Sequence, residues 1–263
     1  MSHDLSKLLQ DWAFQPGQIN ARMVMGDDGE PRVQIRIELG IIQMFADGRP
    51  DGERPFGYPT LLDYHEAQLE EGEDPDASPT DRTSEKQVLT SDDCRGLREE
   101  AAQFYQRYLA LLVLEDFDRV VRDTTRNLRV LDLCAAQGQT EEDRTVLEQF
   151  RPYITMMRSR ALASQALKDN EAKAAIHALD EGLEALRAYF SDSGRPQLFE
   201  QSSEVQMLRG MREALVPKLP VSQRSELKAR LARAVEQENY ELAAILRDEL
   251  RQLKDAPGGV EKA

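Results

Sequence analysis

The sequence predicts an α+β protein that is mainly α-helical, on the basis of three observations. Hydrophobic and polar residues alternate only near the N-terminus, between Arg22 and Phe45, which is typical of a β-hairpin with one buried face. From Cys94 to about Val216 the hydrophobic residues recur at helical spacing instead. Near the C-terminal end, two apolar stripes on either side of Asn239 predict a short antiparallel helical hairpin.

Composition limits the classes of function. The chain has 263 residues, of which 40% are hydrophobic and 31% charged, and this favours one large or two modest globular domains. A net charge of -14 argues against direct binding to nucleic acid, because that affinity comes mainly from Lys and Arg. Cys94 and Cys134 are far apart and form no C-x-x-C motif, so neither a disulfide scaffold nor a zinc site is indicated. Without a signal-peptide pattern or a run of about 18 apolar residues, a cytoplasmic protein is expected.

Residues 1–69 are predicted to form an N-terminal β-hairpin module. Apolar residues alternate with polar ones over Val33–Leu39, and the alternation changes phase after Gly40, which we interpret as a bulge or bend in the strand. An isolated hairpin of this size is only marginally stable. It is therefore expected to pack on Trp12 and Phe14, on later helices, or on a second copy of itself, which makes a homodimer one alternative.

The loop from Ala46 to Pro59 concentrates Gly, Pro and the carboxylates Asp47, Asp51 and Glu53. Carboxylates are ligands for hard cations, but their spacing here does not match the calcium-loop pattern, so turn chemistry is favoured over a metal site. The alternative function that this loop leaves open is a small metal- or ligand-dependent enzyme with its site at Asp47–Glu53.

One histidine is the nearest approach to a general base. His65 is flanked by Asp63 and Glu66, and a carboxylate that orients an imidazole is a common catalytic arrangement. Adjacent positions on a helix do not face each other, however. We therefore favour a partly exposed helix histidine, and no catalytic residue is assigned.

The chain after this loop divides into a linker and a helical region. Residues 70–93 are acidic, rich in Pro and Ser, and nearly free of large apolar residues, which predicts a linker. Residues 94–217 are predicted to form consecutive helices joined by short turns. The breaks between these helices carry turn or capping residues: Glu115-Asp116, Gly138, Asp169-Asn170, Ser191–Gly194 and Pro217.

Small residues recur in one part of this helical region. Within the segment 161–186, Ala163, Ala175 and Gly182 stand where two helices would pack closely. This segment resembles a tetratricopeptide (TPR) repeat, and the stretch 108–128 looks like a degenerate copy. The resemblance implies TPR-like antiparallel helical hairpins, and a generic helical bundle is the alternative.

The C-terminal hairpin, residues 222–254, carries the most specific pattern. Its core reads Y-E-x-A-A-x-L-R-D from Tyr240 to Asp248, and the apolar stripes include Leu231 and Leu250. This pattern resembles the UVR motif, a helical hairpin found in UvrB, UvrC, McsA and ClpC-type ATPases. The resemblance implies a protein–protein contact, possible with another UVR hairpin. The residues that it marks for meeting a partner are Tyr240, Glu241, Arg247, Asp248 and Arg251.

The catalytic sequences of those families are missing from this chain. It has no G-x-x-x-x-G-K-[ST] phosphate loop, no paired C-x-x-C zinc motifs and no GIY-YIG nuclease signature. The resemblance therefore implies a non-catalytic adaptor without a cofactor, acting in nucleotide excision repair or in protein quality control. It would bind protein, with no direct nucleic acid contact and no membrane contact.

Overall fold

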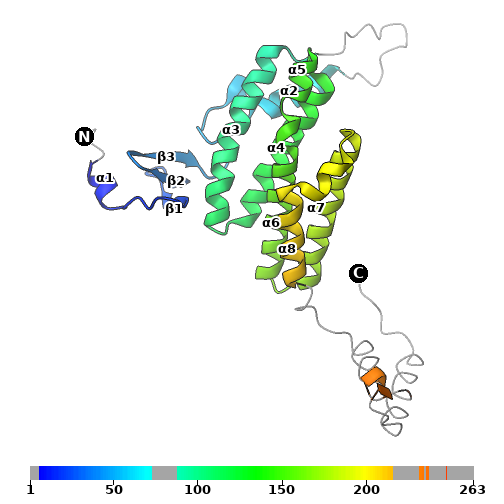
Figure 1. The fold of residues 1–263 in the computed structure, drawn as a ribbon. Helices are drawn as coiled ribbons and strands as arrows, with labels where there is room; N and C mark the ends of the chain where they lie inside the picture. Colours follow the sequence, from blue (N-terminus) through cyan, green and yellow to red (C-terminus); the bar gives the residue numbers. More distant parts are fainter. Residues whose placement is uncertain (1–5, 73–87, 216–230, 234, 237–246, 248–263) are drawn as a thin grey trace, which may run out of the picture. The chain divides into compact units, whose positions relative to one another are not determined.

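The chain is mainly α-helical with a small antiparallel sheet, as the sequence predicts, in the computed structural model of Figure 1. It divides into two compact units, residues 1–215 and residues 216–263. No described helix is long and apolar enough to cross a membrane. The residues that the structure describes are 6–72, 88–215, 231–233, 235, 236 and 247.

A short helix α1 (Ser6–Gln10) precedes a three-stranded sheet with the order β1-β2-β3. The strands are β1 (Asn20–Met25), β2 (Pro31–Ile37) and β3 (Gly40–Phe45), and both neighbouring pairs are antiparallel. Val33 pairs with Met44 across the sheet, and both side chains are buried. Since β1 and β2 contact helix α3, this helix covers the sheet. The predicted homodimer stays a prediction.

The interpretation of Gly40 as a bend within one strand is wrong. Ile37 pairs with Gly40, so Glu38 and Leu39 form a two-residue turn and Gly40 begins a new strand. The phase of the alternation changes because the chain reverses direction there. Leu39 lies at the tip of the turn and is 87% exposed, although the alternation placed it on the buried face.

The helices of the first unit pack as successive neighbours. Contacts join α3 to α4, α4 to α6, α6 to α7 and α7 to α8, so α4 lies between α3 and α6 (Figure 1). Among the described residues of this unit, a short 3-10 helix precedes each of α2, α6 and α8: η1 (Pro55–Gly57), η2 (Glu148–Phe150) and η3 (Pro196–Gln201). The α-helices are α2 (Leu61–Gly72), α3 (Ser91–Val113), α4 (Phe117–Gln137), α5 (Glu141–Thr145), α6 (Arg151–Lys168), α7 (Ala172–Asp192) and α8 (Ser203–Leu215).

Two predicted breaks between helices are confirmed. Glu115 follows α3 with φ 57°, and Asn170 follows α6 with φ 63°. This left-handed conformation ends a helix, and Asn adopts it at lower cost than most residues. The side chain of Asp116 then caps α4 by accepting a hydrogen bond from the backbone N–H of Arg119.

Helix α3 begins within the region predicted as a linker. Thr90 and Asp93 form a capping box, so the helix starts at Ser91. The backbone of Leu89 donates to the carbonyl of Gln137 and accepts from the N–H of Gln139, which joins the start of α3 to the end of α4. The other end of the predicted linker belongs to α2, and residues 73–87 lie outside the described residues.

Small residues lie at the contact between α6 and α7, where the sequence placed them. Ala163 and Ala175 are fully buried, and Gly182 faces Ser159 of α6 so closely that a Cβ atom at position 182 would lie 2.7 Å from the Ser159 Cβ. Close packing of two helices requires such residues. The TPR likeness of the whole region stays a prediction.

Candidate functional site

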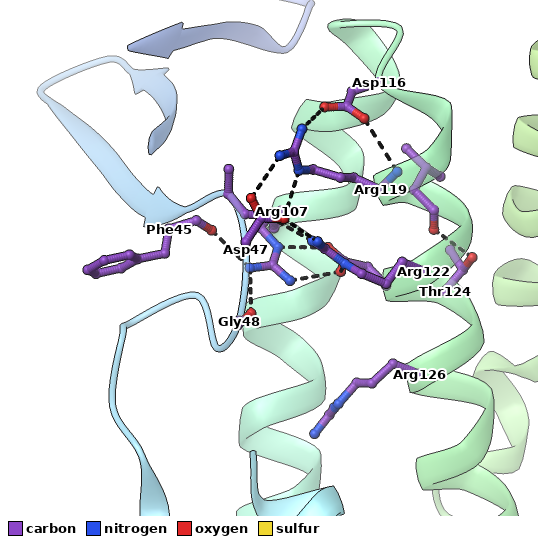
Figure 2. Close-up of polar contacts among 12 residues, drawn as sticks. Phe45, Asp47, Gly48, Arg107, Asp116, Arg119, Arg122, Thr124 and Arg126 are labelled. Atoms are coloured by element: carbon purple, nitrogen blue, oxygen red, sulfur yellow. Dashed lines mark hydrogen bonds and ion pairs between the residues drawn. The ribbon is translucent and has the colours of Figure 1, made fainter. Parts of the chain in front are cut away.

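The acidic loop is bound to helices α3 and α4 through a buried arginine (Figure 2). Arg107 of α3 is 0% exposed. Its Nε and Nη2 donate to the two carboxylate oxygens of Asp123 on α4, each at 2.7 Å. Its Nη1 donates to the carbonyl oxygens of Phe45 at 2.9 Å and Gly48 at 2.7 Å. One guanidinium therefore ties both helices to the end of β3 and to the loop.

Two further arginines bind the first carboxylate of the loop. Arg119 donates to Asp47 Oδ1 at 2.9 Å and Oδ2 at 2.7 Å, and Arg122 also donates to this carboxylate (Figure 2). Arg122 reaches the carbonyl oxygen of Ala46 at 2.7 Å as well. The hydrogen bonds from Arg119 and Arg122 hold the pKa of Asp47 well below its usual range, so this group stays ionised. We call Arg107, Arg119 and Arg122 the arginine clamp.

A second buried charge lies on the same side of α3. Glu100 is 1% exposed, accepts a hydrogen bond from the backbone N–H of Leu61 at 2.8 Å, and forms an ion pair with Arg126 of α4. Arg49 of the loop approaches the same carboxylate at 3.6 Å. Burial lowers the pKa of Arg126 to about 9. Its guanidinium lies over the ring of Phe104, 4.2 Å from the centroid.

The remaining loop carboxylates also meet side chains of the protein. Asp51 pairs with Arg49 at 3.1 Å and accepts a hydrogen bond from Gln103 at 2.9 Å, and Glu53 lies 3.9 Å from Arg49. Among the residues that the structure describes, no group of three or more His, Cys, Asp or Glu side chains could hold a metal ion. This geometry fixes the loop to the helices and leaves the carboxylates paired with cations. Sequence reasoning missed the clamp because its arginines and carboxylates are far apart in the chain.

His65 is buried, so the interpretation of a partly exposed helix histidine is wrong. Helix α2 packs on α3, which leaves His65 8% exposed with its ring 5.0 Å from that of Tyr64. The nearest carboxylate across this contact belongs to Asp93 of α3, with 3.9 Å between Nε2 and Oδ1. Burial lowers the pKa of His65 and Asp93 opposes this change. The imidazole is therefore held in its neutral form.

Stability is expected to depend on pH through His65. Its pKa is lower in the folded protein, so the unfolded chain binds more protons as pH falls below about 6.5. The free energy of unfolding is therefore not reduced by His65 above that pH. It decreases as the pH falls from about 6.5 toward the pKa of His65 in the folded protein. The free energy of unfolding, measured with urea between pH 7.5 and 5, should fall less for His65→Phe than for the wild type. His177→Phe is the control, because His177 has a 75% exposed side chain; equal pH profiles for wild type and His65→Phe would contradict the assignment.

The two cysteines lie far apart in the sequence but side by side in the structure. Cys94 near the start of α3 and Cys134 near the end of α4 are both free and both buried, and each thiol influences the pKa of the other. Burial raises the pKa of Cys134 to about 12, which keeps this thiol protonated and unreactive.

Comparison with known families bears on the C-terminal unit. Residues 222–256 match the family model described as the UvrB/uvrC motif. The chain carries a UVR motif. The matched segment is a small part of the chain. No curated protein and no solved structure matches the chain. UVR motifs mediate protein interactions and can bind other UVR domains.

All five predicted partner-binding residues fall inside the matched UVR segment. Arg247 is helical and exposed. The other four lie outside the described residues, as does the predicted turn at Asn239. They are Tyr240, Glu241, Asp248 and Arg251.

Proposed function

We propose that the protein is a non-catalytic adaptor that binds another protein, such as one with its own UVR hairpin, through residues 222–256. The match of this segment to the UVR motif is the observation that supports the proposal. Excision repair and protein quality control are the two settings in which such a contact would serve. A domain organisation of 1–69, 70–93, 94–217 and 222–254 belongs to the same proposal.

A physical argument also favours docking through the hairpin. Two helices as short as these bury little apolar surface by themselves, so chains of this size usually need a staple, a metal or a partner. The apolar stripe that includes Leu231 and Leu250 would be completed by a partner's helices. Polar residues beside it, including Tyr240 and Arg247, would set the specificity of that contact.

Residues 1–215 would then act as the rigid body that the hairpin is attached to. The charged groups of the clamp are matched to each other: Asp123 binds Arg107, and Asp47 binds Arg119. Such pairing favours a structural role for the loop 46–59, because a catalytic carboxylate needs access to a substrate or metal. Residues 1–215 would thus serve as a structural support, and residues 222–256 would recognise the partner.

Two substitutions in the hairpin should separate folding from recognition. Leu246→Asp places a charge on the apolar stripe and should abolish capture of a partner, since burying a leucine contributes about 1.5–3 kcal/mol. Arg247→Glu exchanges two good helix formers and should leave the free energy of unfolding within about 1 kcal/mol of the wild type. It should still weaken capture at least tenfold by reversing a charge at the contact. Capture from native lysate by the tagged full-length protein, quantified by mass spectrometry, measures both effects.

Arg233→Glu is the matched control, because Arg233 is also helical and exposed but lies outside the predicted contact residues. It should capture the partner as well as the wild type does. A chain ending at residue 221 should capture none. Equal recovery of the same partner by the wild type, Leu246→Asp and this truncation would show that the hairpin does not dock it.

A further inference from the structure

A cavity with a volume of about 380 Å³ lies between helices α3, α4 and α6, and 3-10 helix η2 contributes to its wall. Its floor is apolar and buried: Leu131 is 1% exposed, Leu147 6% and Ile154 5%. Its rim is aromatic and open to solvent, since Tyr105 and Phe150 are 41% and 50% exposed. A buried apolar floor with an accessible mouth is the usual form of a small-molecule site.

The cavity runs along one side of α3. Its lining from this helix includes Arg98, Ala102, Tyr105 and Tyr108, which lie on one face at successive helical turns. With a rise of about 1.5 Å per residue, the backbone positions of Arg98 and Tyr108 are roughly 15 Å apart. An elongated ligand fits this shape, and a volume of about 380 Å³ exceeds what one inserted side chain of a protein partner would fill.

Each end of the cavity has a polar side chain in its lining. Arg98 is half-buried at the mouth, and its charge also acts on Asp143 of α5, whereas Arg95, one turn earlier, forms an ion pair with Asp92. Tyr108 is 1% exposed and lines the opposite end of the cavity. Burial raises the pKa of Tyr108, so the hydroxyl keeps its proton and remains a donor. A ligand oxygen at this end of the cavity could accept a hydrogen bond from that hydroxyl.

We propose that this cavity binds an elongated, small amphipathic monocarboxylate. The carboxylate would lie at Arg98, the apolar chain would lie over Leu131 and Ile154, and an uncharged oxygen at the far end would accept a hydrogen bond from Tyr108. A guanidinium at the mouth selects an anionic head group, because charge-assisted hydrogen bonds are the stronger ones. The apolar floor selects a hydrocarbon chain.

Isothermal titration of the full-length protein with 10-hydroxydecanoate and with decanoate tests this proposal. One molecule of each should bind per chain, and the hydroxylated acid should bind more tightly. Arg98→Gln should weaken the binding of both acids about tenfold. The control Arg95→Gln should change it less than twofold, since Arg95 does not line the cavity.

Two further variants test the site of the ligand's hydrocarbon chain and the hydrogen bond at Tyr108. Ala102→Trp should block both acids by filling the mouth at an exposed position. Tyr108→Phe keeps the ring, so it should remove the advantage of 10-hydroxydecanoate and leave the affinity for decanoate unchanged. Absence of saturable binding to the wild type would overturn the proposal. It would also be overturned if Arg98→Gln behaved like Arg95→Gln, or if Tyr108→Phe left the preference for the hydroxylated acid intact.

Discussion

Replacing Arg107 by methionine is expected to destabilise the protein by about 3–5 kcal/mol, the usual cost of breaking a buried ion pair. The substitution removes the bidentate partner of Asp123, which is also 0% exposed, and leaves this carboxylate only the partly exposed Arg122, at 3.0 Å. It also removes the donor to the carbonyl oxygens of Phe45 and Gly48. For a compact unit of this size the melting temperature should fall by roughly 6–20 °C. Urea unfolding followed by circular dichroism measures the change in free energy.

Two comparisons make the Arg107 result specific. The double variant Arg107→Met, Asp123→Leu should recover part of the lost stability, because the buried carboxylate that lost its bidentate partner is then absent from the core. Arg119→Met should cost no more than about 1 kcal/mol, since exposed pairs contribute little, and the side chains of Arg119 and Asp47 are 32% and 48% exposed. If Arg107→Met and Arg119→Met cost the same, the buried pair does not hold the loop to the helices.

Gly182→Ala is expected to destabilise the protein by about 1–3 kcal/mol, as overpacking does, although Ala is the better helix former by about 0.8–1 kcal/mol. Gly182 lies in the middle of α7, and an added Cβ would be 2.7 Å from the Cβ of Ser159 and 3.0 Å from Cδ1 of Leu208. All three positions are buried, so the neighbours have little room to move. The steric cost therefore exceeds the gain in helix propensity.

A second helical glycine provides the matched control for Gly182. At Gly210 in α8 an added Cβ would meet no heavy atom within 4 Å, so Gly210→Ala should stabilise the protein by about 0.5–1 kcal/mol. Combining Gly182→Ala with Ser159→Gly should relieve the clash, because one methyl-sized group replaces another across the contact. Thermal melts of the three variants test this reversal of sign, and equal effects at positions 182 and 210 would refute it.

Local sequence patterns predicted much of the secondary structure. Period-two alternation located the β-region but merged β2 and β3 into one strand, and the turn residues Glu115 and Asn170 marked the ends of α3 and α6. These features depend on neighbours within a few positions, so periodicity and backbone preferences reveal them. The tight turn at Glu38-Leu39 was missed because neither residue is a typical turn former.

The candidate site depends on contacts that local patterns do not contain. Arg119 and Arg122 stand one turn apart on α4, which places both on one face, but nothing in the sequence connects them to Asp47, more than 70 positions earlier. The burial of His65 against α3 is equally nonlocal. The UVR motif was recognisable for the opposite reason, because its residues form one short, continuous pattern.

The backbone pairing at Leu89 has a mechanical consequence. Its two hydrogen bonds, 2.8 Å to the Gln137 carbonyl and 3.0 Å from the Gln139 N–H, join the chain just before α3 to the chain just after α4. A tension applied to the chain at residues 88 and 139 would therefore load these bonds before it reached the helices. Because the pairing is parallel, the two bonds would be loaded together in shear. The pairing at Leu89 thus closes the α3–α4 hairpin at its open end, so an external force passes through these two hydrogen bonds. The cavity lined by α3 and α4 is shielded from that force.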